Sequence, residues 1–194
     1  MSTDSRNEGQ LLCDVIGLES LVDEITYTLA SAATSAPTAT SILGPFWRAN
    51  APRREMGSSI VHDIPDGDHT FVYGTVTNHL NGKPIERAEL DVWHTAPNGL
   101  YEQQDKTQMD YNLRGRFTTG KDGKYSFYCL RPTSYPIPND GPAGKLLELL
   151  DRHPMRPAHI HFIVSSPKPS PYHRSPPLYC PNCPHRSPHP TTNQ

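Results

Sequence analysis

GRFTTGKDGKYSFYCL, residues 115–130, is the stretch that decides the fold class. Apolar and polar residues alternate on both sides of its centre, which is typical of half-buried β-strands. The central Asp122-Gly123 pair supplies the positive φ that a tight turn needs. The stretch therefore predicts two short antiparallel strands joined as a hairpin.

The same pattern occurs on both sides of this stretch. Upstream, FVYGTVT (71–77) runs into NHLNGKP (78–84), a turn with Asn-Gly at its centre, and IERAELDVWHT (85–95) alternates again. This predicts a second hairpin. Downstream, PAHIHFIVS (157–165) predicts a further strand. Many short strands separated by Gly and Pro turns favour an antiparallel β-sandwich.

Two segments predict helices instead. LLCDVIGLESLVDEITYTL (11–29) has the apolar spacing of an amphipathic helix, with some allowance for Gly17, and AGKLLELLDRH (143–153) is a short helical insert. We therefore expect a mainly β protein. An antiparallel β-sandwich core at 41–166 is preceded by a short, truncated helical segment and linker at 1–40.

The last region, 167–194, differs in composition, with nine prolines in 28 residues and no apolar periodicity. Proline cannot donate to a strand ladder or a helix, so this segment is interpreted as a disordered tail. A zinc site is the alternative. It would lack the hairpin and helix of a zinc finger, and its ligands would be Cys180, Cys183, His185 and His189.

Composition excludes some classes of partner. The chain has 194 residues and a formal net charge of -2, which gives no electrostatic reason to expect nucleic acid or an anionic membrane. No stretch approaches the roughly 18 apolar residues of a membrane-spanning helix. The polar N-terminus lacks a signal peptide, and the four cysteines do not form a dense disulfide framework. A cytoplasmic location is expected.

RPAHIHF, residues 156–162, is the strongest candidate for a reactive site. On a strand, His159 and His161 project from the same face and can both reach one ion. Imidazole suits iron, zinc, copper and nickel, so the pair does not identify the metal. Arg156 adds a permanent cation that could hold an anionic substrate. The alternative is a pair of surface histidines on a half-exposed strand.

Two tyrosines in turn contexts extend this candidate. Tyr101 lies in NGLYEQQ and Tyr135 in PTSYPIPNDGP. Each alone is typical of a packing residue with a solvated hydroxyl. Together with the two histidines, two phenolates would make a hard, anionic set suited to a trivalent ion such as Fe(III).

Six blocks, in this order and spacing, resemble the intradiol ring-cleavage dioxygenases over about residues 11–166. The YPIPNDGP and ILGPF motifs are most similar to the hydroxyquinol 1,2-dioxygenase branch, with the chlorocatechol enzymes close. The blocks are SILGPFW, GKPIERAELDVWHTAPNGLYEQQ, YNLRGRF, KDGKYSF, PTSYPIPNDGP and RHPMRPAHIHFIVSSP.

This resemblance implies a non-haem Fe(III) bound by Tyr101, Tyr135, His159 and His161. It makes Tyr135 the axial ligand that leaves when the substrate binds, and it places Arg156 over the bound ring. The implied reaction uses O2 to cleave hydroxyquinol or a related catechol between its two hydroxyl-bearing carbons. The product is a muconate-type diacid, 3-hydroxymuconate or its tautomer maleylacetate. The implied substrate pocket is lined by Leu43, Gly44, Pro45, Phe46, Ile137 and Pro138.

The resemblance leaves several points open. A homodimer is expected of the family, but this chain enters the helical region late, near Leu11, which counts against it. Ser175 falls where relatives carry a glutamine that supports the site. His94 is interpreted as structural or as a support for the metal ligands. Asp23 and Glu24 either meet a ring hydroxyl or lie on a solvated helix face. The competing hypothesis is an inactive, truncated β-sandwich remnant or binding module.

Overall fold

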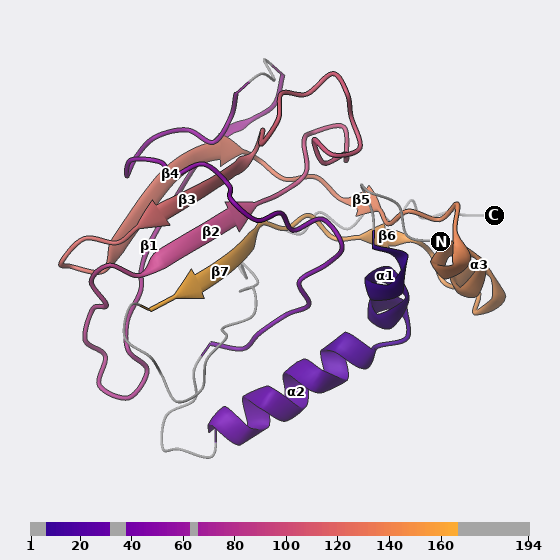
Figure 1. The fold of residues 1–194 in the computed structure, drawn as a ribbon, viewed down its shortest axis with the longest axis horizontal. Helices are drawn as coiled ribbons and strands as arrows, with labels where there is room; N and C mark the ends of the chain where they lie inside the picture. The colour runs from indigo at the N-terminus through magenta and orange to yellow at the C-terminus, as the bar shows by residue number, and fades with distance from the viewer. Residues whose placement is uncertain (1–6, 32–37, 63–65, 167–194) are drawn as a thin grey trace, which may run out of the picture.

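The computed structural model describes residues 7–31, 38–62 and 66–166 (Figure 1). It shows the predicted mainly β fold, with two helices at the N-terminal end and one between the fifth and sixth strands. In chain order the elements are α1 (Glu8–Val15), α2 (Leu18–Ser31), β1 (His69–Thr75), β2 (Glu89–Trp93), β3 (Arg114–Thr118), β4 (Lys124–Leu130), β5 (Tyr135–Pro136), α3 (Pro142–Leu149), β6 (Met155–Arg156) and β7 (His161–Ser165).

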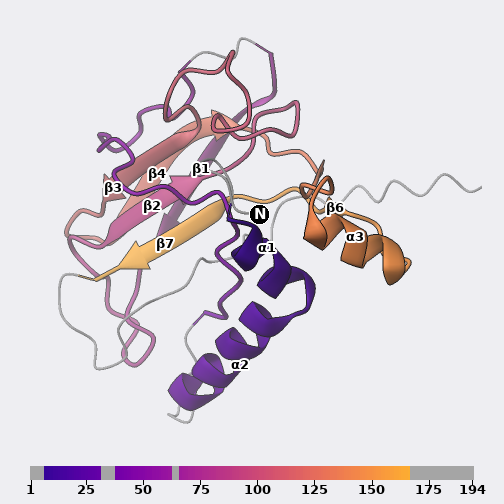
Figure 2. The same ribbon diagram turned by 45° about the vertical axis from the view of Figure 1, so that its right-hand side comes forward.

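The strands form two facing antiparallel sheets and a small third pair. One sheet has the order β3-β2-β7, the second contains β1 and β4, and β5 pairs with β6 beside them. In Figures 1 and 2 the helices lie on one side of the molecule, where β7, β5 and β6 meet. This arrangement is the predicted antiparallel β-sandwich.

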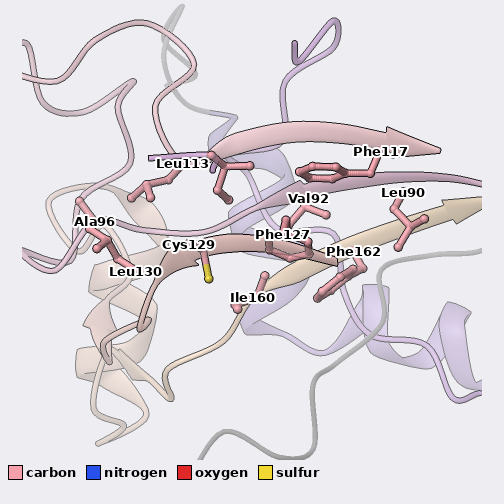
Figure 3. Close-up of a cluster of buried hydrophobic side chains, with 11 residues drawn as sticks. Leu90, Val92, Ala96, Leu113, Phe117, Phe127, Cys129, Leu130, Ile160 and Phe162 are labelled. Atoms are coloured by element: carbon pink, nitrogen blue, oxygen red, sulfur yellow. The ribbon is translucent and has the colours of Figure 1, made fainter. Parts of the chain in front are cut away.

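A single apolar core lies between the two larger sheets (Figure 3). The rings of Phe117 on β3 and Phe127 on β4 stack across it, with centroids 5.0 Å apart. Its members are fully or almost fully buried: Ile60, Leu90, Val92, Ala96, Leu113, Phe117, Phe127, Cys129, Leu130, Ile160 and Phe162. Burying such side chains is the main favourable term in the stability of this part of the chain.

The predicted hairpin at 115–130 is wrong, although both of its strands form. β3 pairs with β2 and β4 pairs with β1, so the chain crosses from one sheet to the other. Gly123 does adopt the positive φ expected of it, 69°. The connection is an arch because Phe117 and Phe127 must enter the same core from opposite sheets. A turn motif cannot by itself distinguish an arch from a hairpin.

The second predicted hairpin forms only at its turn. Asn78 N–H donates to Lys83 O at 2.8 Å, and Thr77 bridges Pro84 in antiparallel fashion. Gly82 has a φ of 67°, as the Asn-Gly motif predicts. Beyond this turn the chain diverges, and β1 and β2 lie in different sheets. The strand pairing predicted for 71–77 and 85–95 is therefore wrong.

The helix predicted at 11–29 is present as two helices. The break falls at Gly17, whose φ of 78° is outside the helical range. Leu11 and Val15 of α1 pack with Ala143 and Leu147 of α3, so the predicted helical insert anchors the N-terminal segment. Among the described residues, no helix is both long enough and apolar enough to cross a membrane.

The strand predicted at 157–165 is shorter than expected, since β7 begins at His161. The predicted division of the chain at residues 40 and 166 stays a prediction. The tail 167–194, with its alternative zinc ligands Cys180, Cys183, His185 and His189 and with Ser175, lies outside the described residues.

Candidate metal centre

Three adjacent pieces of backbone bring the predicted site residues together. Tyr135 on β5 is the register partner of Arg156 on β6. His161, the first residue of β7, pairs with Trp93, the last residue of β2. Tyr101 follows β2 in the turn that reverses at Asn98-Gly99, where Gly99 N–H donates to Ala96 O. The strand ends therefore place all five predicted side chains in one region.

Four donor atoms converge there. The hydroxyl oxygens of Tyr101 and Tyr135 are 3.2 Å apart, and the Tyr135 oxygen lies 3.5 Å from Nε2 of His159. The Nε2 atoms of His159 and His161 are 3.0 Å apart. Arg156 donates from Nη1 to the Tyr135 oxygen at 3.4 Å. The pair of surface histidines, the alternative for this motif, does not describe this arrangement, because both imidazoles are buried.

The two histidine rings are held in different ways. Nδ1 of His159 lies 2.6 Å from the carbonyl oxygen of Pro157, so Nδ1–H donates there and Nε2 presents its lone pair to the site. The ring of His161 stacks on Trp93 with centroids 4.6 Å apart and planes 1° from parallel. Ile160 and Phe162 point the other way, into the core, as the alternation predicts.

Burial favours the neutral forms of Tyr101, His159 and His161. Burial, followed by the neighbouring Tyr135 hydroxyl, raises the pKa of Tyr101 well above its usual 10. Burial and then the charge of Arg156 lower the pKa of His159 to about 4. Burial, then His159 and Arg156, lower the pKa of His161 well below 6.5. The imidazoles are therefore unprotonated at neutral pH and free to act as ligands.

The donor set fits a single first-row metal ion. Nitrogen and oxygen ligands bind such ions at about 2 Å, so neighbouring ligands lie about 3 Å apart, as these do. A bound cation would lower the pKa of the tyrosine hydroxyls and favour the phenolates. In the described part of the chain, no group of three or more His, Cys, Asp or Glu side chains is placed to hold a metal ion. The mixed tyrosine–histidine set is the candidate.

Part of the predicted pocket wall reaches this site. A Cβ placed on the buried Gly44 would lie 3.5 Å from Nη1 of Arg156 and 3.7 Å from Cε1 of His161. Phe46 stacks on Tyr101 at 4.6 Å between centroids, and Leu43 packs against the same aromatic cluster. Ile137 packs instead against the α1–α3 cluster, and Pro45 and Pro138 are half-buried.

A buried ion pair behind Tyr101 was not predicted from the sequence. Arg114 donates from Nε to Glu102 Oε1 at 2.7 Å and from Nη2 to Gln103 Oε1 at 2.8 Å. Its guanidinium carbon lies 5.7 Å from the centroid of the Tyr101 ring. Arg114 lies directly before the strand predicted from Gly115 onward, and the sequence around it did not identify its partner.

The structure treats His94, which directly follows β2, differently from the two carboxylates on α2, Asp23 and Glu24. His94 is buried, with Nδ1 2.8 Å from Thr95 O, which supports its structural interpretation. Glu24 is exposed on α2, as a solvated helix face requires. Asp23 is half-buried, and burial and then the charge of Glu19 raise its pKa.

Asp23 belongs to a carboxylate cluster with Asp14 and Glu19, near Arg156. Burial, then a hydrogen bond and the charge of Glu19, raise the pKa of Asp14 from 3.8 to about 8, against the opposing effect of Arg156. A carboxyl pKa raised by folding means that the folded state binds the proton more tightly than the unfolded chain. This group therefore makes stability fall as pH rises from about 4 to about 8.

We expect the Asp14→Asn variant to gain stability relative to the parent protein as pH increases across this window. Asparagine keeps the size and a hydrogen-bonding group but cannot ionise. Urea unfolding midpoints measured between pH 4.5 and 8.5 check this, with Asp66→Asn, an exposed aspartate outside the cluster, as control. Parallel pH profiles for the parent and Asp14→Asn would contradict the assignment.

Comparisons with known proteins identify the family of this chain. Residues 42–182 match the family model described as Dioxygenase, and residues 1–34 match the Catechol dioxygenase N terminus. The chain is 49% identical to the intradiol ring-cleavage dioxygenase prcA of Aspergillus niger, over 86% of this chain and 53% of that protein. It is 52% identical to a catechol 1,2-dioxygenase of Candida albicans, over 86% and 54%.

The fold is also similar to a solved structure of hydroxyquinol 1,2-dioxygenase from Pseudomonas putida. The TM-score is 0.76 at 36% identity, covering 92% of this chain and 58% of that one. The chain spans about half the length of the curated relatives it matches. On the matched residues, the chain belongs to the intradiol ring-cleavage dioxygenase family.

Proposed function

We propose that this chain carries the active site of a non-haem Fe(III) intradiol dioxygenase. Its substrate would be hydroxyquinol or a related catechol, cleaved by O2 between the two hydroxyl-bearing carbons to 3-hydroxymuconate/maleylacetate or a similar diacid. The observation that carries the proposal is the convergence of two tyrosine oxygens and two imidazole nitrogens within 3.0–3.5 Å of their neighbours. A relative named for catechol and a structure named for hydroxyquinol support both substrate classes.

Each side chain would have a distinct task. Tyr101, Tyr135, His159 and His161 would hold the iron, which would supply Lewis acidity and withdraw electrons from the bound diol so that its ring can react with O2. The Tyr135 oxygen, nearest to Arg156 and His159, is the candidate acceptor for a substrate hydroxyl proton. Arg156 would stabilise negative charge that develops on the ring.

The walls would orient and shield the ring. Gly44 allows its backbone to approach Arg156 and His161 closely, because a larger residue would bring a side chain against both. Phe46 presents an apolar face beside Tyr101, which suits a flat aromatic substrate. Leu43 packs in the same aromatic cluster as Phe46, and we propose Pro45, Ile137 and Pro138 as further pocket residues, with Ile137 packed against the α1–α3 cluster.

The competing proposal is a β-sandwich without catalysis. Within the described residues, β7, which carries His161, pairs with β2 alone and leaves its other edge without a strand partner. An open edge weakens the element that holds a ligand. A cytoplasmic setting stays a prediction.

Visible absorption of the iron-supplemented protein separates these proposals. A two-tyrosinate Fe(III) site should give a broad charge-transfer band that shifts when hydroxyquinol or catechol is added under nitrogen. When O2 is then admitted, one molecule of O2 should be consumed for each molecule of diol that is cleaved. Tyr135→Phe should change the band, whereas Tyr73→Phe, an exposed tyrosine on β1, should not. A folded, colourless protein would overturn the iron site, and a coloured protein inert to O2 would support the non-catalytic alternative.

We propose further that the apolar face of α2 packs against a second copy of the chain, as the family resemblance implies. Leu18, Leu21, Val22 and Ile25 recur at helical spacing and are 45–54% exposed. The double substitution Leu21→Lys/Ile25→Lys is expected to halve the mass measured by light scattering. Ser20→Lys/Glu24→Gln adds the same charge off this face and should leave the mass unchanged. A monomeric parent protein would contradict the proposal.

A further inference from the structure

One hydrogen bond joins the N-terminal helices to the wall of the metal centre. The backbone N–H of Leu43 donates to Oε1 of Glu19 at 3.0 Å, across 24 residues of sequence. Glu19 lies in the first turn of α2 and its contact is partly buried. A hydrogen bond to an ionised carboxylate, shielded from water, is stronger than a neutral one.

The segment that Glu19 holds touches the site at several points. Gly44, next to Leu43, faces Arg156 and His161, since a Cβ placed on it would lie 3.5 and 3.7 Å from these side chains. Two residues further on, Phe46 stacks on Tyr101. A displacement at Leu43 would therefore move groups that lie next to two candidate ligands and the candidate ring-stabilising arginine.

The hydrogen bond from Leu43 to Glu19 acts as a tether on a segment that has no regular backbone structure of its own. Gly44 has a φ of 75°, and glycine can leave this conformation more easily than any other residue. The structure gives no helix or regular strand to residues 41–47, so ladder hydrogen bonds do not fix this segment. Glu19, in contrast, is on a helix whose own backbone is regular. The hydrogen bond to Glu19 therefore restricts the position of the loop at Leu43.

We propose that Glu19 is a positioning residue that fixes the Leu43–Phe46 wall of the metal centre. Holding this wall is a task of the N-terminal helical segment that is separate from any packing between subunits. The tether rests on the geometry above. Its effect on an aromatic diol rests on the proposed function.

Hydrogen exchange tests the tether without iron or substrate. In Glu19→Ala, the Leu43 amide followed by NMR should exchange about tenfold to a hundredfold faster, the loss expected for a hydrogen bond to a charged group. Glu24→Ala, an exposed glutamate on the same helix, should leave Leu43 unchanged. Unchanged exchange at Leu43 in folded Glu19→Ala would overturn the proposal, as would an equal effect of Glu24→Ala.

If Glu19→Ala does not fold, the conservative variant Glu19→Gln tests the hydrogen bond to Leu43 instead. Glu19→Gln keeps an acceptor oxygen but loses the charge, so Leu43 should exchange a few-fold faster while the Leu21 amide, bonded to Gly17 O within the helix, stays unchanged. Identical exchange at Leu43 in parent and Glu19→Gln would then overturn the charge-assisted form of the tether, because the carboxylate charge would add nothing to this hydrogen bond.

Kinetics test its consequence separately. With iron bound, Glu19→Ala should raise KM for hydroxyquinol about tenfold and change kcat little, and Glu19→Gln should restore most of the loss. A Leu43 amide that loses protection while KM stays constant would overturn the positioning role but leave the tether. If the parent shows no turnover, the proposed function fails and the exchange result still stands.

Discussion

His161→Ala is expected to lower the affinity for iron more than a hundredfold and to abolish the charge-transfer band. Loss of an outer partner of a metal ligand reduces metal affinity by about 10–100-fold, and loss of the ligand itself should exceed this. Among the described residues, no third His, Cys, Asp or Glu side chain joins His159 and His161 in a group that could hold a metal ion. Iron titration followed by absorbance, with metal content determined after gel filtration, measures the effect.

His161→Ala is a clean test because the position of residue 161 is fixed by its backbone pairing as well as by its side chain. Its backbone pairs with Trp93 in the β2–β7 ladder, and its ring stacks on the Trp93 indole. His161→Ala removes the nitrogen without removing either strand. His153→Ala, at an exposed histidine eight residues earlier, is the control and should bind iron as the parent does. Equal affinities in parent and His161→Ala would remove the basis of the proposed function.

The sequence indicated which side chains lie together at the candidate site, whereas it did not indicate the pairing of the strands that carry them. His159 and His161 are two apart, so strand alternation alone predicts that they share a face. Tyr101 and Tyr135 came from matching blocks of sequence, since no spacing rule joins residues that are 34 apart. The turn motifs at Asn81-Gly82 and Asp122-Gly123 gave correct backbone conformations but wrong partners. Which sheet a strand joins depends on the shared core, which a local motif does not contain.

The hydrogen bonds and ion pairs that support the site could not be predicted from local sequence motifs either. Glu19 and Leu43 are 24 residues apart, and Glu102 and Arg114 are 12 apart around an irregular loop. Polar pairs of this kind have no periodicity, and charged residues are usually exposed. The sequence therefore identifies the groups that can do chemistry before it identifies the groups that hold them.

The second large effect concerns Glu102→Met, which we expect to destabilise the fold by about 3–5 kcal/mol, the cost of leaving a buried charge unpaired. The Arg114 and Glu102 side chains are 1% and 2% exposed, so water cannot solvate Arg114 in place of the carboxylate. Gln103 Oε1 would remain as its neutral acceptor. Urea unfolding of the parent and variant gives the difference in free energy of unfolding.

The same substitution at the partner should cost less. In Arg114→Met, Glu102 keeps its contact with Arg48 Nη1 at 2.8 Å, so its charge stays paired. The double variant should cost less than the sum of the single variants, because neither charge is left alone in it. The Arg53–Glu89 pair is the matched control. It is just as close, at 2.6 Å, but its side chains are 65% and 32% exposed, so Arg53→Met should cost no more than about 1 kcal/mol.

The order of these three free energies shows whether burial determines the contribution of the Arg114–Glu102 pair to stability. If burial decides, Glu102→Met exceeds Arg114→Met, and both exceed Arg53→Met, although the three changes break contacts of similar length. Equal costs for Glu102→Met and Arg53→Met would mean that the buried pair is replaced without strain by packing or water. Arg114 would then not stabilise the loop that carries Tyr101. The position of this candidate ligand would depend on the stacking of Phe46 and on the hydrogen bond that the Tyr101 backbone N–H donates to Gln104 Oε1.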